Sequence, residues 1–270
     1  MSVYAAKPTP PRSGRNLRGR PRACAFYDLD GTLASLNLLH ATAFYLANLG
    51  RWSARGGYLA RLVLDLPRLY LAERDDRRLL NMKLFEAYKG VSRDRLWELG
   101  DEYCERVLVR HLYPRAIEML EGNRAAGIEP VLVTGSPDFL VEPLARRLNV
   151  EHFAANRLVY SRGLATGRMR EPVMAGSEKS AWCAEFAAAR RIDLAACWGY
   201  ADSYYDLPFL CALGHPVAVN PDRRLLAAAH NRQWPVVRFS HDAESSGQDA
   251  ASGAWLLDWL GGAADGATGK

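Results

Sequence analysis

The chain has 270 residues, of which 49% are hydrophobic and 24% charged, and this is enough for one large domain with a sizeable core. The formal net charge of +5 would favour a nucleic-acid partner, but residues 1–22 alone carry six basic and no acidic side chains. Subtracting those six leaves −1 for the rest, so no nucleic-acid or membrane partner is expected for the body. We predict a disordered basic tail over 1–22, with an arm that binds nucleic acid or anionic lipid as the alternative.

The five cysteines are an odd number and form no C-x-x-C pair. This pattern is typical of free thiols in a reducing compartment rather than of a disulfide framework. No apolar run approaches the roughly 18 residues that a membrane span requires, and the N-terminus lacks the apolar core of a signal peptide. The sequence therefore indicates a cytoplasmic protein.

The first predicted strand is the short apolar run at residues 23–29, and a long helical block follows it. Between residues 36 and 111, apolar side chains recur at helical spacing in segments that are interrupted at Gly50, Pro67 and Gly90. Ser92 is the predicted N-cap of the last of these segments. Because no strand interrupts the block, we predict an inserted helical cap domain over 36–111.

Strands and helices alternate after residue 111. A predicted helix at 114–126 precedes a strand at 128–134, and Ser136 with Pro137 predicts the N-cap and first residue of the next helix. Further strand-like runs lie at 150–154, 157–160, 195–200, 216–220 and 235–239. This alternation predicts an α/β fold with a largely parallel sheet and helices on both faces.

The domain boundaries follow from this order of elements. We assign residues 23–35 and 112–240 to the core domain that contains the sheet, and 36–111 to the cap. Residues 241–270 are a C-terminal extension, in which the apolar stretch AWLLDWL at 254–260 predicts a short helix docked on the body.

Polar side chains collect where predicted strands end, and in a parallel sheet these ends form the ligand-binding edge. They are Asp28 and Asp30 after the first strand, Thr134 and Gly135 after the second, Lys179 in a later loop, and Asp202 and Asp206 after the strand at 195–200. Clustered carboxylates need a cation, and an all-oxygen ligand set suits Mg²⁺. A hydroxyl, a helix start and a lysine form an anion site that fits phosphate. We therefore predict phosphoryl chemistry, in which one aspartate attacks phosphorus and its neighbour two residues on handles the proton.

Four stretches carry a family resemblance. FYDLDGTL, VLVTGS, Lys179 and GYADSYYDLP resemble the four motifs of the haloacid dehalogenase superfamily, in their usual order. The helical block after the first motif, with SPDFLVEPLARRLNV and HPVAVNPDRRLLAAA, is similar to the phosphoserine-phosphatase-like branch, subfamily IB. The resemblance covers roughly residues 23–240 and implies a Rossmann-like parallel core with an all-helical C1-type cap.

The resemblance implies a role for each motif residue. Asp28 would be the nucleophile and a Mg²⁺ ligand, and Asp30 would be the general acid and base, with its backbone carbonyl on the metal. Lys179 would neutralise both the phosphate and Asp28. The other implied phosphate-binding residues are Gly31, Thr134 and Gly135, and the other implied metal ligands are Asp202 and Asp206. Asp30 favours hydrolysis, because the ATPase branches usually have threonine at that position.

Two positions depart from the pattern of the related phosphatases. Tyr205 stands where they commonly have asparagine, and Ser136 stands in a stretch where they tend to have Gly-Gly. We expect a Mg²⁺-dependent phosphatase for a small phosphomonoester, with phosphoserine or another amino-alcohol phosphate first and histidinol phosphate as an alternative. A phosphotransferase or phosphomutase on the same site and a non-catalytic binding protein remain open.

Overall fold

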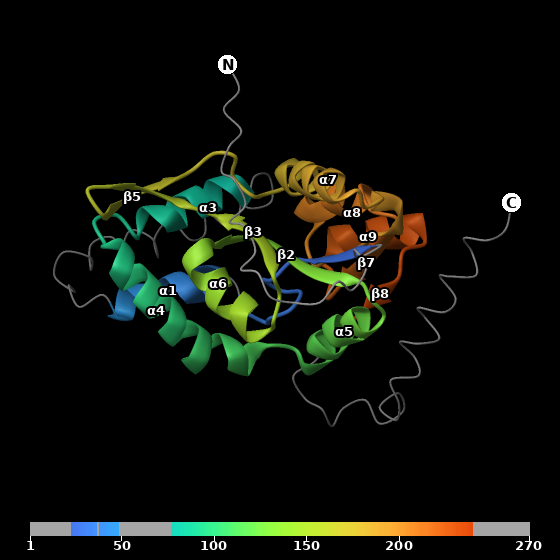
Figure 1. Cartoon of the computed structure of the whole chain (residues 1–270), viewed down its shortest axis with the longest axis horizontal. Helices are drawn as coiled ribbons and strands as arrows, with labels where there is room; N and C mark the ends of the chain where they lie inside the picture. Colours follow the sequence, from blue (N-terminus) through green and yellow to red (C-terminus); the bar gives the residue numbers. More distant parts are fainter. Residues whose placement is uncertain (1–22, 37, 49–76, 240–270) are drawn as a thin grey trace, which may run out of the picture.

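A computed structural model describes residues 23–36, 38–48 and 77–239 (Figure 1). The predicted basic tail, the predicted helix around residues 59–66 and the C-terminal extension lie outside the described residues.

Six parallel strands form the central sheet in the order β3-β2-β1-β6-β7-β8. The strands are β1 (Cys24–Tyr27), β2 (Glu129–Pro137), β3 (His152–Asn156), β6 (Trp198–Ala201), β7 (His215–Val219) and β8 (Val236–Val237). β1 lies between β2 and β6, with Tyr27 level with Leu132 and Tyr200. The parallel sheet is confirmed, and the ends of these three strands meet at one edge.

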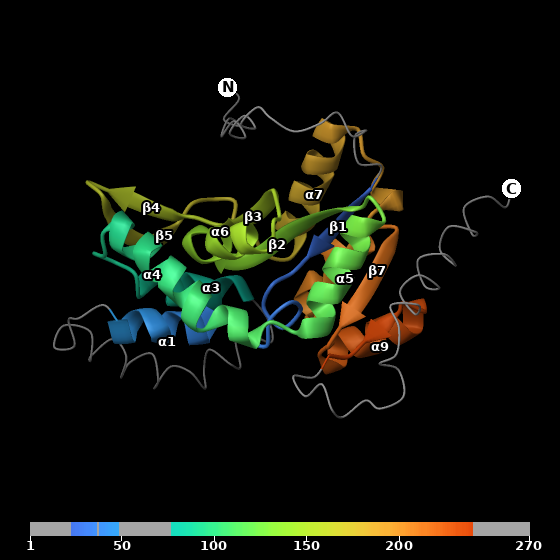
Figure 2. The same cartoon turned by 60° about the horizontal axis from the view of Figure 1, so that its bottom comes forward.

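Helices cover both faces of the sheet. The side chains of β1 are buried on both faces, because successive side chains of a strand point to opposite sides. Cys24 and Phe26 pack with the helices α7 (Ser177–Arg190), α8 (Leu207–Cys211) and α9 (Arg223–Arg232). Ala25 and Tyr27 face the other way, toward α5 (Pro114–Ala125) and α6 (Asp138–Arg147). Figure 2 shows the arrangement from a second side. The α/β class with two covered faces is therefore confirmed.

Three further helices gather beyond one end of the sheet (Figures 1 and 2). They are α1 (Leu38–Asn48), α3 (Arg77–Glu86) and α4 (Arg93–Arg106), and we call them the helical group. The side-chain oxygen of Ser92 accepts a hydrogen bond from the Arg95 N–H at 3.3 Å, which confirms the predicted N-cap. Rings of Tyr45 and Tyr88 pack on Phe139 of α6. The group occupies the segment predicted to be a cap, and its status as a separate domain stays a prediction.

The chain between β3 and α7 forms a hairpin that the sequence did not predict. β4 (Leu158–Ser161) and β5 (Leu164–Met169) pair antiparallel, apart from the main sheet. The run at 157–160 is thus a strand, as predicted, but it pairs with β5 and not with the main sheet, and β5 lies against the helical group. The Gly90 N–H donates to the Ala165 carbonyl at 2.7 Å, and the Ala165 N–H donates to the Val91 carbonyl at 2.8 Å. Gly163 and Gly167, both with positive φ, break the pattern that would have indicated β5.

The prediction that Ser136 caps α6 is wrong. β2 continues through Pro137, which pairs with Asn156 beyond a bulge, and α6 begins at Asp138. Pairing with β3 keeps the chain extended for three residues longer than its apolar run. Proline is tolerated there because a strand end or bulge does not require its missing N–H.

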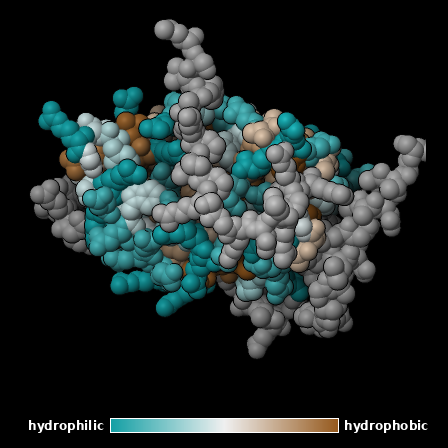
Figure 3. Space-filling model, viewed as in Figure 1, coloured by the Kyte–Doolittle hydropathy of each residue, from teal (hydrophilic) through white to brown (hydrophobic). Residues whose placement is uncertain are grey.

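The face in Figure 3 is mostly hydrophilic, with small separate hydrophobic areas. Among the described residues, the large apolar side chains that are well exposed are Met82 and Leu164. None of the helices in the described ranges is long and apolar enough to cross a membrane. The short 3-10 helices are η1 (Leu108–His111), η2 (Leu194–Ala196) and η3 (Tyr204–Asp206).

Gly100 permits the close approach of α4 and α6. A Cβ at this buried position would overlap the carbonyl oxygen of Phe139. We expect Gly100→Ala to lower the free energy of unfolding by at least about 2 kcal/mol, because backbone must move. Urea unfolding measures this. Gly127→Ala is the control, since its Cβ meets nothing within 4 Å and only the positive φ is unfavourable, by about 1 kcal/mol. Equal losses in the two variants would contradict the packing argument.

Candidate active site

Asp28 lies one residue past β1, where the backbone still follows the sheet. Its N–H donates to the carbonyl of Tyr200 on β6 at 2.9 Å, so the side chain stands at the edge formed by the strand ends. The side chain is buried, with only 2% of the residue exposed. Its Oδ1 accepts the Leu29 N–H at 2.8 Å, which holds the carboxylate in one orientation.

Lys179 forms a buried ion pair with two aspartates. From the first turn of α7, its Nζ lies 3.0 Å from Asp28 Oδ1 and 2.9 Å from Asp206 Oδ1. All three residues are at most 3% exposed. Burial of a lone charge is strongly unfavourable, so each of these charges depends on the others. The lysine that the sequence singled out is thus an integral part of the site.

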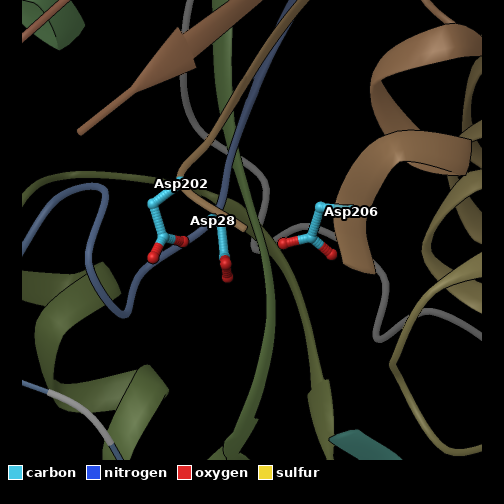
Figure 4. Close-up of side chains that lie close together, drawn as sticks. All are labelled: Asp28, Asp202 and Asp206. Carbon is cyan, nitrogen blue, oxygen red and sulfur yellow. The ribbon is translucent and has the colours of Figure 1, made fainter. Parts of the chain in front are cut away.

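Asp28, Asp202 and Asp206 form a group that can hold a metal ion. One carboxylate oxygen from each lies within 4.8 Å of the others, and Figure 4 shows Asp28 between the other two. Three carboxylates and one ammonium leave a net charge of −2 on these four groups. All donors are oxygens, which suits a hard divalent cation such as Mg²⁺.

Gly31 makes room for Asp202. Its φ of +77° belongs to the tight turn after Asp30, and a Cβ there would overlap the carboxylate of Asp202. Any larger residue would be strained at this φ and would displace a candidate metal ligand. Gly31 therefore contributes through its small size. Its N–H donates to the Ala34 carbonyl at 2.8 Å within the turn, and the phosphate-binding role that the resemblance implied for Gly31 stays a prediction.

The end of β2 brings Thr134 and Ser136 to the same edge. The Ser136 hydroxyl donates to Asp30 Oδ2 at 2.7 Å, and the Ser136 N–H donates to Thr134 Oγ1 at 3.1 Å. Because Thr134 Oγ1 accepts this bond, its own hydrogen can point toward a ligand. Asp30, half-buried, and Thr134, fully buried, thus lie in one connected network.

Asn156, at the end of β3, was missed by the sequence reasoning. Its Nδ2 donates to the Gly135 carbonyl at 2.7 Å, and its Oδ1 accepts the Met174 N–H at 2.7 Å. The residue is 1% exposed. It therefore links the end of β2, where Thr134 and Gly135 lie, to the segment that leads into α7, the helix of Lys179. No local pattern indicates this role, because both partners are distant in sequence.

The helical group approaches the site through Asn81 and Tyr103. A Cβ at Gly135 would lie 2.9 Å from Asn81 Nδ2, so this buried amide of α3 lies close to the end of β2. Burial raises the pKa of Tyr103 on α4, and the nearby charge of Asp30 raises it further. Asn81 and Tyr103 thus bring the helical group close to Gly135 and to Asp30.

Tyr205, the departure noted in the sequence, belongs to η3 between Asp202 and Asp206. Its N–H donates to Ser203 Oγ at 3.4 Å, and its hydroxyl oxygen is buried. The structure thus brings the motif residues that the sequence analysis named to one edge of the sheet, and Tyr205 directly precedes Asp206 in η3.

Comparison with known proteins gives consistent matches. The sequence matches the family of haloacid dehalogenase-like hydrolases over residues 25–210. A protein of Mycobacterium tuberculosis (strain H37Rv), named "probable phosphatase", is 30% identical over 239 residues, which are 87% of this chain and 82% of that protein. A histidinol-phosphatase of Neisseria meningitidis serogroup C is 26% identical over 224 residues, which are 80% of this chain and 98% of that protein.

Two solved structures share the fold. A protein of unknown function from Bordetella pertussis Tohama I is 28% identical, with a TM-score of 0.71 over 80% of this chain and 98% of that one. A phosphoserine phosphatase solved as a phospho-aspartyl intermediate analogue has a TM-score of 0.62 at 15% identity, over 89% of this chain and 99% of that one. At this low identity, the second likeness concerns the fold.

Lys179→Met tests the buried ion pair. The variant leaves the carboxylates of Asp28 and Asp206 buried without their cation, so we expect the free energy of unfolding to fall by about 3–5 kcal/mol. Urea unfolding at pH 7 in EDTA measures this. Lys83→Met removes an ion pair with Glu86 whose side chains are 57% and 52% exposed, and it should change stability by less than about 1 kcal/mol. A wild-type stability of Lys179→Met would refute the buried pair.

Asn156→Ala tests the link between the two loops. It leaves the Gly135 carbonyl and the Met174 N–H without their partner, and we expect a loss of about 2–4 kcal/mol in stability. Turnover should fall by at least about 10-fold, because Asn156 no longer holds the end of β2 at Gly135. Asn48→Ala, at an exposed helix end, is the matched control. If both variants resemble the wild type in stability and rate, Asn156 has no such role.

Proposed function

Because the chain belongs to the haloacid dehalogenase-like hydrolase family, in which it is a phosphatase, we propose that it hydrolyses a small phosphomonoester through an aspartyl-phosphate on Asp28 with the help of Mg²⁺. The observation that carries this proposal is the position of Asp28, buried at the strand edge with Lys179 at 3.0 Å and two further carboxylates beside it.

The first step is attack by an Asp28 oxygen on phosphorus. The new bond forms as the bond from phosphorus to the leaving oxygen breaks, and Asp30 gives its proton to that oxygen. Lys179 lies beside the Asp28 oxygen and can offset the negative charge of the phosphoryl group. The Thr134 hydroxyl and the Gly135 backbone would bind phosphoryl oxygens.

The second step is hydrolysis of the aspartyl-phosphate. Asp30, now ionised, takes a proton from water while the water oxygen attacks phosphorus and the bond to Asp28 breaks. The products are an alcohol and inorganic phosphate, and both aspartates return to their starting states. Threonine in place of Asp30 could not hold and return this proton, so the residue favours hydrolysis.

The carboxylates of Asp28, Asp202 and Asp206 would hold Mg²⁺, with the Asp30 backbone carbonyl as a further ligand. When bound, the ion supplies positive charge that offsets the repulsion between these carboxylates and the phosphoryl oxygens. The donor set fits, since it is made of oxygens alone and has a net negative charge together with Lys179.

For the substrate we propose an amino-alcohol phosphate. Two comparisons support this class, since a histidinol-phosphatase matches over nearly its whole length and a phosphoserine phosphatase shares the fold. Phosphoserine is the first candidate and histidinol phosphate the second.

Transfer of the phosphoryl group to another acceptor remains an alternative on the same residues. A phosphotransferase or phosphomutase would use Asp28 and Asp30 in the same way but would exclude water from the second step. The body of the chain has a small net charge, which supports a small-molecule substrate rather than a nucleic acid. A cytoplasmic location is likewise our proposal, and it rests on the cysteine pattern.

Phosphate release from a panel of phosphomonoesters tests the proposal. The panel contains phosphoserine, histidinol phosphate, phosphoethanolamine, glycerol phosphate and 4-nitrophenyl phosphate, each with Mg²⁺ and with EDTA. We expect release that requires Mg²⁺ and falls by more than about 10³-fold in Asp28→Asn, which keeps the size of the side chain but removes the nucleophile.

The other outcomes each exclude something definite. Release that survives Asp28→Asn would exclude Asp28 as the nucleophile. Phosphate that appears on an added alcohol rather than free in solution would identify a phosphotransferase. Release in EDTA equal to that in Mg²⁺ would exclude the metal. Asp94→Asn, on the exposed start of α4, controls for the loss of any carboxylate.

A further inference from the structure

Ser136 is a residue of the site to which neither the family resemblance nor the proposed mechanism gives a role. It follows Gly135 on β2, and it is 2% exposed. Its hydroxyl donates to Asp30 Oδ2 at 2.7 Å, which is a short distance for a hydrogen bond between oxygens. A buried hydroxyl that donates to an acid is held in place and is not a solvated surface group.

We propose that Ser136 is a positioning residue that holds the carboxyl group of Asp30 toward the leaving oxygen of the substrate, an inference that rests on the proposed function. Asp30 follows β1 and lies next to the glycine of a tight turn, so its backbone alone does not fix the rotation of its carboxyl group. A donor on Oδ2 fixes the plane of the group and thereby the direction in which Oδ1 points. Proton transfer depends steeply on this geometry, since a misplacement of about 1 Å can reduce a rate 10²-fold.

Ser136 also connects the carboxyl group of Asp30 to Thr134, which is proposed to bind the phosphoryl group. Its N–H donates to Thr134 Oγ1 at 3.1 Å, and its hydroxyl donates to Asp30 Oδ2. Ser136 thus contacts both the proposed acid and a residue proposed to bind the phosphoryl group. The position of the acid is therefore set relative to the residue proposed to bind the phosphoryl oxygens. A glycine at this position would keep the bond from the backbone N–H to Thr134 and lose the bond from the hydroxyl to Asp30.

The nature of the leaving group distinguishes a positioning role from a contact with the phosphate. An alkyl phosphate needs a proton on its leaving oxygen, whereas 4-nitrophenyl phosphate has a good leaving group that needs little protonation. Loss of a correctly placed acid therefore slows the first ester much more than the second. Loss of a phosphate ligand would slow both esters equally.

The experiment compares Ser136→Ala with the wild type on 4-nitrophenyl phosphate and on the fastest alkyl ester of the panel, both with Mg²⁺. We expect kcat/KM for the alkyl ester to fall about 10- to 100-fold and that for the aryl ester by less than about 3-fold. Inhibition by inorganic phosphate should stay unchanged. Ser136→Thr, which keeps the hydroxyl, should recover most of the alkyl rate.

Ser180→Ala is the matched control, because the Ser180 hydroxyl donates to the Ser177 carbonyl and points to no site residue. If Ser136→Ala folds poorly in a thermal melt, Ser136→Cys keeps the shape with a weaker donor and should show the same selective loss. Equal losses for the two esters, weaker phosphate inhibition, or no loss would each overturn the inference. A wild type that hydrolyses neither ester would instead refute the proposed function.

Discussion

The buried contact of Lys179 with Asp28 and Asp206 is the interaction on which the rest of the site depends. It joins a strand, a helix and the turn after β6, so each charge is neutralised by a group from another part of the chain. None of these charges could remain buried alone. The contact therefore serves the fold and the chemistry together, because the groups that neutralise one another also surround the position proposed for the phosphoryl group. Asp202 adds a further negative charge, which a divalent cation can balance.

The order of the strands explains why the site lies where it does. β1 is flanked by β2 and β6, and its last residue, Tyr27, pairs with Leu132 and Tyr200, although about 100 residues separate β1 from β2 in the sequence. β2 continues past this level to Pro137. The helical group fits into that gap in the sequence without disturbing the sheet, because it leaves after β1 and returns before α5. Two glycines show how closely these parts pack. A side chain at Gly31 would overlap Asp202, and a side chain at Gly100 would overlap the backbone of α6.

The sequence predicted the parallel strands and the charged residues that follow them, because both produce local patterns, but it ended β2 three residues too early. An apolar run followed by aspartate identifies Asp28 without any knowledge of its neighbours in space. Asn156 and Ser136 could not be found in this way, since their roles come from partners 21 and 106 residues away. Ser136 next to Pro137 even imitates an N-cap, and only the pairing of Pro137 with Asn156 shows that the strand continues. The hairpin was missed because its glycines interrupt the alternation that identifies a strand.

The hairpin links these unpredicted features to one another. Asn156 lies just before β4 and Met174 follows β5, so the hydrogen bond from the Met174 N–H to Asn156 Oδ1 closes the base of the segment that carries the hairpin. Beyond this base, the hairpin pairs with the backbone of residues 90–93 in the helical group. At its base, this segment contacts the end of β2 through the hydrogen bond to the Gly135 carbonyl. Farther out, it contacts the helical group. This segment therefore holds the helical group close to the end of β2, in addition to the covalent chain on either side of the group. The same arrangement brings Asn81 close to Gly135.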